Sequence, residues 1–194
     1  GYRTAAFVSG LVLDSGFGLG RGFDTYDDEL GAVEAIERSA EKVSDAALRW
    51  LGAPPDKPFF AWVHYFDPHS PHQPPEHFRE GFATPYDGEI AFADSQVARL
   101  LSWIDEKGLR DHTLIVVAGD HGEAFGEHDE AEHGLLIYST TMHVPLIFSL
   151  PRALPSGHIV TQPVALIDVF PTIAEVLGWP GNEDLEGRSL VSAW

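Results

Sequence analysis

The residues best suited to chemistry in this sequence are Asp120 and His121, which directly follow an apolar run. That run, residues 113–118, is rich in β-branched side chains, a pattern typical of a strand buried on both faces. In open α/β sheets, ligands bind at the carboxyl ends of the parallel strands. We therefore expect the pair to face such a crevice. Gly119 and Gly122 flank it, and we expect them to let the chain turn without a Cβ clash.

A carboxylate oxygen beside an imidazole nitrogen is a metal-binding combination. This donor pair suits Mn²⁺, Zn²⁺ or Fe better than Ca²⁺, which prefers oxygen ligands alone. We predict that Asp120 and His121 bind a divalent metal. The alternative is that Asp120 caps a following helix while His121 faces solvent.

The ten histidines of the chain are unevenly placed. One group lies at and after the apolar segment 59–65, and the other follows the apolar run 113–118. Two neighbouring parallel strands would bring both loops to one edge of the sheet, where imidazoles could handle a metal or an anion. The first group is His64, His69, His72 and His77, and the second is His121, His128 and His133.

Three further histidines are candidates with open alternatives. His69 lies in a proline-stiffened loop, where it could clamp an anionic oxygen or protonate a leaving group, or simply belong to a rigid surface loop. His64 is expected within a strand, as a site residue or as a hydrogen-bonded core histidine. His133 follows a charge run at 127–132 that we expect to be mostly solvated, and spacing alone favours a solvated loop for it too.

Apolar periodicity predicts the elements that must position these residues. Ala53-Pro54-Pro55 is expected to end the first helix, and Asp168 to cap the last one, with Pro171 in its first turn. Strands alternating with helices predict an α/β fold, with a largely parallel sheet flanked by helices. The predicted strands are 4–8, 59–65, 113–118 and 144–150; the helices are 30–51, 87–106 and 168–177; the main loops are 10–22, 67–78 and 120–134.

Composition narrows the classes of partner. The formal net charge of −18 argues against nonspecific binding to nucleic acid or to an anionic membrane, since both need a positive surface. An anionic substrate would then need local positive charge, which a bound cation could supply. With no cysteine, the chain has no disulfide or thiolate nucleophile. No apolar stretch approaches the roughly 20 residues that span a bilayer.

Taken in order along the chain, several motifs together resemble the sulfatase family of the alkaline-phosphatase-like superfamily. No single motif is decisive, but the ordered set covers nearly the whole sequence. The motifs are Gly1-Tyr2-Arg3-Thr4-Ala5, Arg21-Gly22-Phe23-Asp24, Pro58-Phe59-Phe60 leading to Pro68-His69-Ser70-Pro71, Gly119-Asp120-His121-Gly122-Glu123, Gly126-Glu127-His128, His133-Gly134 with Tyr138, Val144-Pro145-Leu146, and Ile167-Asp168-Val169-Phe170-Pro171-Thr172.

The resemblance assigns roles to the candidate residues. It implies that Asp120 and His121 bind the metal and that His69 contacts the sulfate or the leaving-group oxygen. His133 is implied to contact the same group, which reverses the expectation from spacing alone. The resemblance thus implies catalytic roles for His69 and His133, and substrate contacts for both and, more weakly, for His64.

The implied function is a metal-dependent sulfuric ester hydrolase. Its divalent metal would be Mn, Zn, Mg or Ca, its nucleophile a formylglycine, and its substrate a small-molecule or glycan sulfate ester. The formylglycine motif, Cys/Ser-x-Pro-x-Arg, does not occur in this sequence and is expected upstream of it. We therefore expect residues 1–194 to be one segment of a catalytic domain, inactive alone and self-associating through the surface that the missing part would cover.

Two departures from the family pattern keep other functions open. Many sulfatases have Asn and Lys where this chain has His121 and His133. Histidine at both points is more similar to phosphonate monoester and phosphodiester hydrolases, so a phosphate or phosphonate ester, or a phosphoethanolamine-type transfer, is an alternative reaction. A non-catalytic metal- or partner-binding domain is a further alternative. The sequence leaves the organic part of the substrate, the compartment and the oligomeric state open.

Overall fold

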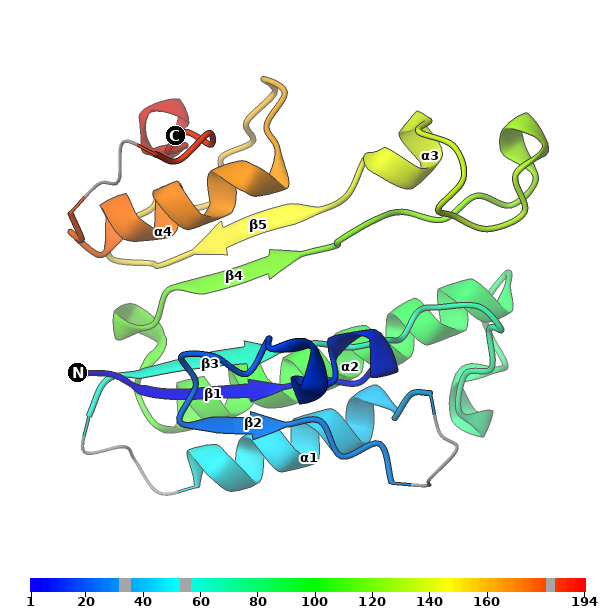
Figure 1. The fold of residues 1–194 in the computed structure, drawn as a ribbon, viewed down its shortest axis with the longest axis horizontal. Helices are drawn as coiled ribbons and strands as arrows, with labels where there is room; N and C mark the ends of the chain where they lie inside the picture. Colours follow the sequence, from blue (N-terminus) through cyan, green and yellow to red (C-terminus); the bar gives the residue numbers. More distant parts are fainter. Residues whose placement is uncertain (32–35, 53–56, 181–183) are drawn as a thin grey trace. The chain divides into compact units, whose positions relative to one another are not determined.

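The computed structural model describes residues 1–31, 36–52, 57–180 and 184–194. They form two compact units, Gly1–Gly108 and Leu109–Trp194 (Figure 1).

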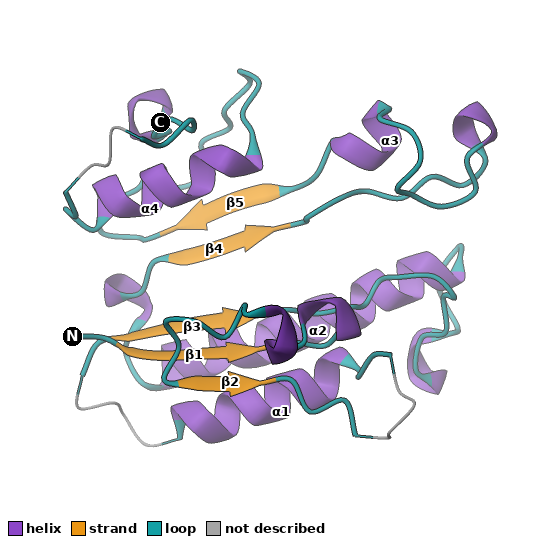
Figure 2. Cartoon of the chain, viewed as in Figure 1, coloured by secondary structure: helices purple, strands orange, loops and turns teal. Residues whose placement is uncertain are grey.

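The first unit is built on a three-stranded parallel sheet with the order β2-β1-β3, drawn in orange in Figure 2. The strands are β1 (Arg3–Phe7), β2 (Thr25–Asp27) and β3 (Phe59–Val63). Phe7, at the end of β1, is in register with Asp27 on one side and Val63 on the other. All three strands therefore end at the same edge of the sheet, and the loops that follow begin there.

Two helices, α1 (Ala40–Leu51) and α2 (Pro85–Glu106), belong to this unit. The apolar face of α1 packs on β1, and Ala5, Phe7, Val43 and Ala47 are almost completely buried there. Thr84 begins α2 with a capping box, in which its hydroxyl and the Asp87 carboxylate each accept a hydrogen bond from the other residue's backbone N–H. The helix ends at Glu106, before Gly108, close to the predicted bounds.

The first helix begins later than predicted. The described residues 36–39 are not helical, because Glu37 forms an antiparallel bridge with Gly10 and the Arg38 N–H donates to the Ser9 carbonyl at 2.9 Å. These contacts hold the segment in an extended form against the end of β1. Residues 32–35 of the predicted helix and its predicted stop at Ala53-Pro54-Pro55 lie outside the described residues.

The second unit contains an antiparallel strand pair, β4 (Ile115–Ala118) and β5 (Leu146–Ser149), with Ala118 opposite Leu146. Pro145 lies just before β5, as expected for a proline at a strand start, and its carbonyl accepts the Gly119 N–H at 3.1 Å. The link between these strands contains a short 3-10 helix, Glu127–Asp129, and one short α-helix, α3 (Ser139–Met142).

The last helix, α4 (Val169–Val176), starts where predicted with Asp168 at its N-cap position, but the Asp168 side chain makes no capping hydrogen bond to it. Its carboxylate instead accepts hydrogen bonds from the N–H groups of Arg188 at 2.9 Å and Ala165 at 3.0 Å, and these bonds lower the pKa of Asp168. The Thr172 hydroxyl accepts the Leu190 N–H at 2.9 Å. Asp168 and Thr172 therefore attach the C-terminal segment to the helix.

The α/β class, with a parallel sheet and flanking helices, is confirmed, and the predicted strands agree with the observed ones to within two residues at each end. Strand β2 was not predicted, because three residues are too few to show a periodic pattern. Among the helices that the structure describes, none has the length and apolarity needed to cross a membrane.

Candidate active site

Asp120 and His121 lie just beyond the end of β4, where the sequence predicted them. The described residues 121–126 are not helical, so the alternative that Asp120 caps a helix is wrong. The Asp120 carboxylate accepts the His121 backbone N–H at 3.0 Å. Nδ1 of His121 lies 2.9 Å from the Gly122 carbonyl, which can only accept, so Nδ1 carries the proton. In the neutral ring, the lone pair is therefore on Nε2.

The donor atoms of this pair fit a divalent cation. Nε2 of His121 lies 3.8 Å from an Asp120 carboxylate oxygen. Metal–nitrogen and metal–oxygen bonds of about 2.0–2.2 Å allow one ion to reach both atoms. Within the described part of the chain, however, no group of three or more His, Cys, Asp or Glu side chains is arranged to hold a metal. The pair thus offers two donor atoms, fewer than a metal site requires.

His133 lies against His121, which contradicts the expectation of a solvated residue from spacing alone. The two imidazole rings stack with their centroids 3.9 Å apart. Nδ1 of His133 is 3.0 Å from the carboxylate of Glu123, whose side chain is only 6% exposed. Asp120, His121, Glu123 and His133 therefore form one local cluster in the second unit. Glu123, which sequence reasoning missed as a site residue, is the last residue of the Gly-Asp-His-Gly-Glu motif.

Replacing Glu123 with glutamine should lower kcat by about 10- to 100-fold in the complete protein, meaning the whole polypeptide to which this chain belongs. The carboxylate fixes the orientation of His133 and supplies negative charge beside its ring, and an amide retains the shape but not the charge. Steady-state kinetics measure the effect. The matched control is Glu132→Gln, an exposed residue of the same loop that should retain the wild-type rate. An unchanged kcat for Glu123→Gln would remove Glu123 from the site.

The acidic loop before His133 is more ordered than the sequence suggested. Glu130, in the charge run expected to be mostly solvated, is only 4% exposed. Its carboxylate accepts the N–H groups of Leu135 at 2.9 Å and Leu136 at 3.0 Å. These bonds close the loop around His133. The other residues of the charge run 127–132 are exposed, as expected.

Gly122 is needed for a close backbone contact rather than for a turn. A Cβ atom there would lie 2.2 Å from the Thr140 carbonyl oxygen, and the Gly122 N–H donates to the Thr141 carbonyl at 2.7 Å. The loop carrying His121 is therefore pressed against α3.

We expect Gly122→Ala to destabilise the protein by about 1–3 kcal/mol, because backbone must move to admit the methyl group. Thermal unfolding of the complete protein gives the measurement. Gly119→Ala is the matched control, since its Cβ would approach no atom closer than 3.4 Å. Equal melting temperatures for the two variants would contradict the steric explanation.

His69 is held firmly in the loop after β3. Its Nδ1 donates to the Ser70 carbonyl at 2.7 Å, and its ring stacks on Phe66 with centroids 4.1 Å apart. The loop is anchored at both ends: the Asp67 carboxylate accepts the Ala40 N–H at 2.8 Å, and buried Glu89 of α2 accepts the Gln73 N–H at 2.6 Å. Burial raises the pKa of Asp67. The proline-containing loop after β3 is therefore also held by hydrogen bonds to α1 and α2.

His64 follows the last residue of β3 rather than lying within the strand. Its backbone N–H donates to the Phe7 carbonyl at 2.9 Å, and its Nδ1 lies 3.1 Å from the Ser9 hydroxyl. The His64 side chain is hydrogen-bonded, as expected for a core histidine, but it is only half-buried.

The predicted site residues are divided between the two units. Asp120, His121 and His133 come together in the second unit, and His64 and His69 follow β3 in the first. That all five line one site remains a prediction.

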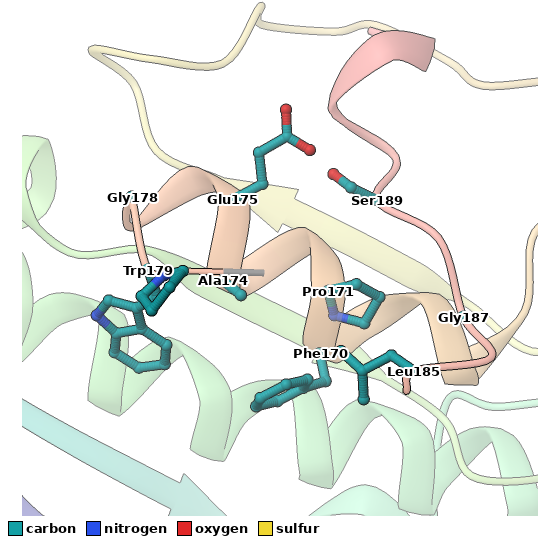
Figure 3. A pocket seen from close by; sticks show the side chains of 10 residues that line it. Phe170, Pro171, Ala174, Glu175, Gly178, Trp179, Leu185, Gly187 and Ser189 are labelled. Carbon is teal, nitrogen blue, oxygen red and sulfur yellow. The ribbon is translucent and has the colours of Figure 1, made fainter. Parts of the chain in front are cut away.

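A cavity of about 440 Å³ in the second unit contains none of these residues (Figure 3). It lies beside α4 and is lined mainly by apolar side chains, including Phe170, Trp179 and Leu185. Because its lining offers one carboxylate, Glu175, and no histidine, the cavity lacks the ligands that a combined metal and anion site requires.

Comparison with known proteins gives consistent results. The sulfatase family model matches residues 1–179. The chain is 28% identical over 165 residues to steryl-sulfatase of Mus musculus, covering 77% of this chain and 26% of that protein. It is 35% identical over 124 residues to iduronate 2-sulfatase of Homo sapiens, covering 61% of this chain and 21% of that protein. The chain thus spans about a quarter or less of these relatives.

Solved structures show the same fold. The phosphonate monoester hydrolase of Silicibacter pomeroyi matches 97% of this chain and 58% of its own, with 20% identity and a TM-score of 0.77. A protein of the alkaline phosphatase superfamily from Vibrio parahaemolyticus matches 98% of this chain and 48% of its own, with 22% identity and a TM-score of 0.73. With the family model matching nearly its whole length, this chain belongs to the sulfatase family.

Proposed function

We propose that the complete protein is a metal-dependent hydrolase of sulfuric esters. Membership of the sulfatase family is the observation that carries this proposal. The clustering of Asp120, His121 and His133 supports it, since a cation site beside an imidazole suits an anionic ester. A sugar sulfate is one reasonable substrate class, because one structural relative was solved with D-glucosamine-2-N,6-O-disulfate as its substrate.

In this proposal the side chains of the chain have distinct tasks. Asp120 and His121 would hold the divalent cation, Mn, Zn, Mg or Ca, which supplies positive charge toward the ester oxygens. His133, oriented by Glu123, and His69, oriented by the Ser70 carbonyl, would each present Nε2 to the substrate. In its protonated form, such a nitrogen donates a hydrogen bond to an anionic oxygen or a proton to the departing one. His64 would be a further substrate contact.

We also propose that residues 1–194 do not turn over substrate alone. The formylglycine nucleophile and the remaining metal ligands would come from a part of the complete protein outside this sequence. The incomplete ligand set among the described residues supports this. Leu135 and Ile137, each 87% exposed, would then be covered by the rest of the protein or, in the isolated segment, by a second copy.

The second candidate function is hydrolysis of a phosphonate monoester or phosphodiester. The presence of histidine at both 121 and 133 favours it, because the sequence resemblance at these two positions points to that branch. Phosphoethanolamine-type transfer belongs to the same candidate.

One assay separates the candidates: the complete protein with its metal is given 4-nitrophenyl sulfate, a 4-nitrophenyl phosphonate monoester and bis(4-nitrophenyl) phosphate. We expect the highest kcat/KM with the sulfate. A higher value with either phosphorus ester would favour the second candidate. No turnover of any ester by the metal-loaded protein would indicate a non-catalytic domain.

A metal titration of residues 1–194 tests the incomplete site. Mn²⁺, Zn²⁺ or Ca²⁺ should raise its melting temperature little, because half a ligand set holds a cation poorly. Micromolar binding would instead identify a self-sufficient metal module.

A further inference from the structure

Ser9 is a fully buried residue that the proposed mechanism does not use. It lies two residues beyond β1, and His64 follows β3 immediately, so the two side chains meet at the carboxyl edge of neighbouring parallel strands. The Ser9 carbonyl accepts the Arg38 N–H at 2.9 Å, and Ser9 itself is 0% exposed. Its backbone is therefore fixed by Arg38, and its side chain is enclosed by the protein.

The hydroxyl of Ser9 makes two contacts with one residue. Its oxygen lies 2.9 Å from the His64 carbonyl oxygen and 3.1 Å from His64 Nδ1. A carbonyl oxygen can only accept a hydrogen bond, and a hydroxyl has one proton to donate. Both contacts are attractive only if the hydroxyl donates to the carbonyl and Nδ1–H donates to the hydroxyl oxygen. The opposite arrangement would bring two oxygen lone pairs together at 2.9 Å.

We propose that Ser9 is a positioning residue that keeps the Nδ1 proton on His64, so that His64 gains and loses its other proton only at Nε2. In the neutral ring, Nε2 then carries a lone pair, which suits a proton acceptor and repels an anionic ester oxygen. If the complete protein is the proposed esterase, Nε2 is then the atom of His64 that meets the substrate, as a proton acceptor in the neutral ring and as a hydrogen-bond donor to an anionic oxygen in the protonated ring. The tautomer itself does not depend on that function.

The first test uses the unaltered complete protein. ¹⁵N-labelled histidine is introduced, and spectra are recorded at about pH 9, where an ordinary imidazole is neutral. The His64 signals are identified by their loss in His64→Gln. We expect a pyrrole-type Nδ1 and a pyridine-type Nε2. A pyrrole-type Nε2 would overturn the proposal, whether or not the protein hydrolyses any ester.

The second test compares two variants. Ser9→Ala should allow His64 to adopt both neutral tautomers. It should also lower kcat with little change in KM. Ser9→Thr, which restores a hydroxyl, should recover the single tautomer and most of the rate. Retention of one Nδ1–H form in a folded Ser9→Ala protein would contradict the role of the hydroxyl. Normal spectra in an inactive wild-type protein would count against the proposed function alone.

Discussion

Alanine in place of Asp120 should reduce kcat/KM of the complete protein about a thousandfold. Two ligand atoms are available in this part of the site, the Asp120 carboxylate oxygen and His121 Nε2, 3.8 Å apart. Removing the carboxylate takes away the anionic ligand and leaves a single imidazole nitrogen. Metal-assisted charge stabilisation contributes several kcal/mol to such reactions, and about 4 kcal/mol corresponds to three powers of ten.

Metal content must be measured together with the rate. Asp120→Ala should contain less bound divalent metal after dialysis, as measured by elemental analysis. Asp111→Ala is the matched control, because Asp111 is an exposed residue of the same unit that pairs with Arg152 at the surface. If Asp120→Ala retained both the metal and the rate, the metal site would have to lie elsewhere.

Arg38→Ala should lower the free energy of unfolding by about 3–5 kcal/mol, the range observed when one partner of a buried ion pair is removed. The Arg38 side chain is 4% exposed, and Nη1 lies 2.6 Å from the Asp27 carboxylate. The guanidinium also donates to the carbonyls of Val8 at 3.0 Å, Asp27 at 2.9 Å and Glu29 at 3.2 Å. All of these acceptors would lose their bond to the guanidinium in the variant, and the Asp27 carbonyl would keep the Val8 N–H at 2.9 Å.

The matched control for this change is Arg99→Ala. Arg99 pairs with Asp45 across the surface, with side chains that are 39% and 47% exposed, and such pairs contribute about 0–1 kcal/mol. Chemical unfolding of the complete proteins, followed by tryptophan fluorescence, gives both values. A loss for Arg38→Ala no larger than for Arg99→Ala would mean that the strand ends do not depend on the guanidinium.

The main elements could be predicted because their causes are local. The apolar run of β4 and the capping box and apolar stripe of α2 are all visible within one segment. The start of α1 was not predictable in this way. Glu37 and Arg38 have helical spacing with the residues after them, but the bridge to Gly10 and the bond to Ser9 keep them extended.

In the candidate site too, features set within one segment could be predicted, and contacts between distant segments could not. The placement of Asp120 and His121 after a strand could be inferred, because the end of an apolar run marks the sheet edge. Contacts between residues far apart in the sequence could not be inferred: within the second unit Glu123 reaches His133 across ten residues, and within the first unit Ser9 reaches His64 across 55. Such pairs depend on how the loops fold. Glu130, which belongs to a charge run expected to be solvated, fixes the loop before His133 because its carboxylate accepts the Leu135 N–H.

Which ring nitrogen of a histidine makes the hydrogen bond determines which nitrogen a chemical reagent can label. His64, His69, His121 and His133 each have Nδ1 directed at an oxygen acceptor, whereas His158 has Nε2 directed at the Ala193 carbonyl. The ring nitrogen that carries the lone pair attacks the acyl carbon of an acylating reagent and displaces its leaving group. The four should therefore be modified on one nitrogen of the ring and His158 on the other, so the regiochemistry of the adducts in one digest would distinguish them.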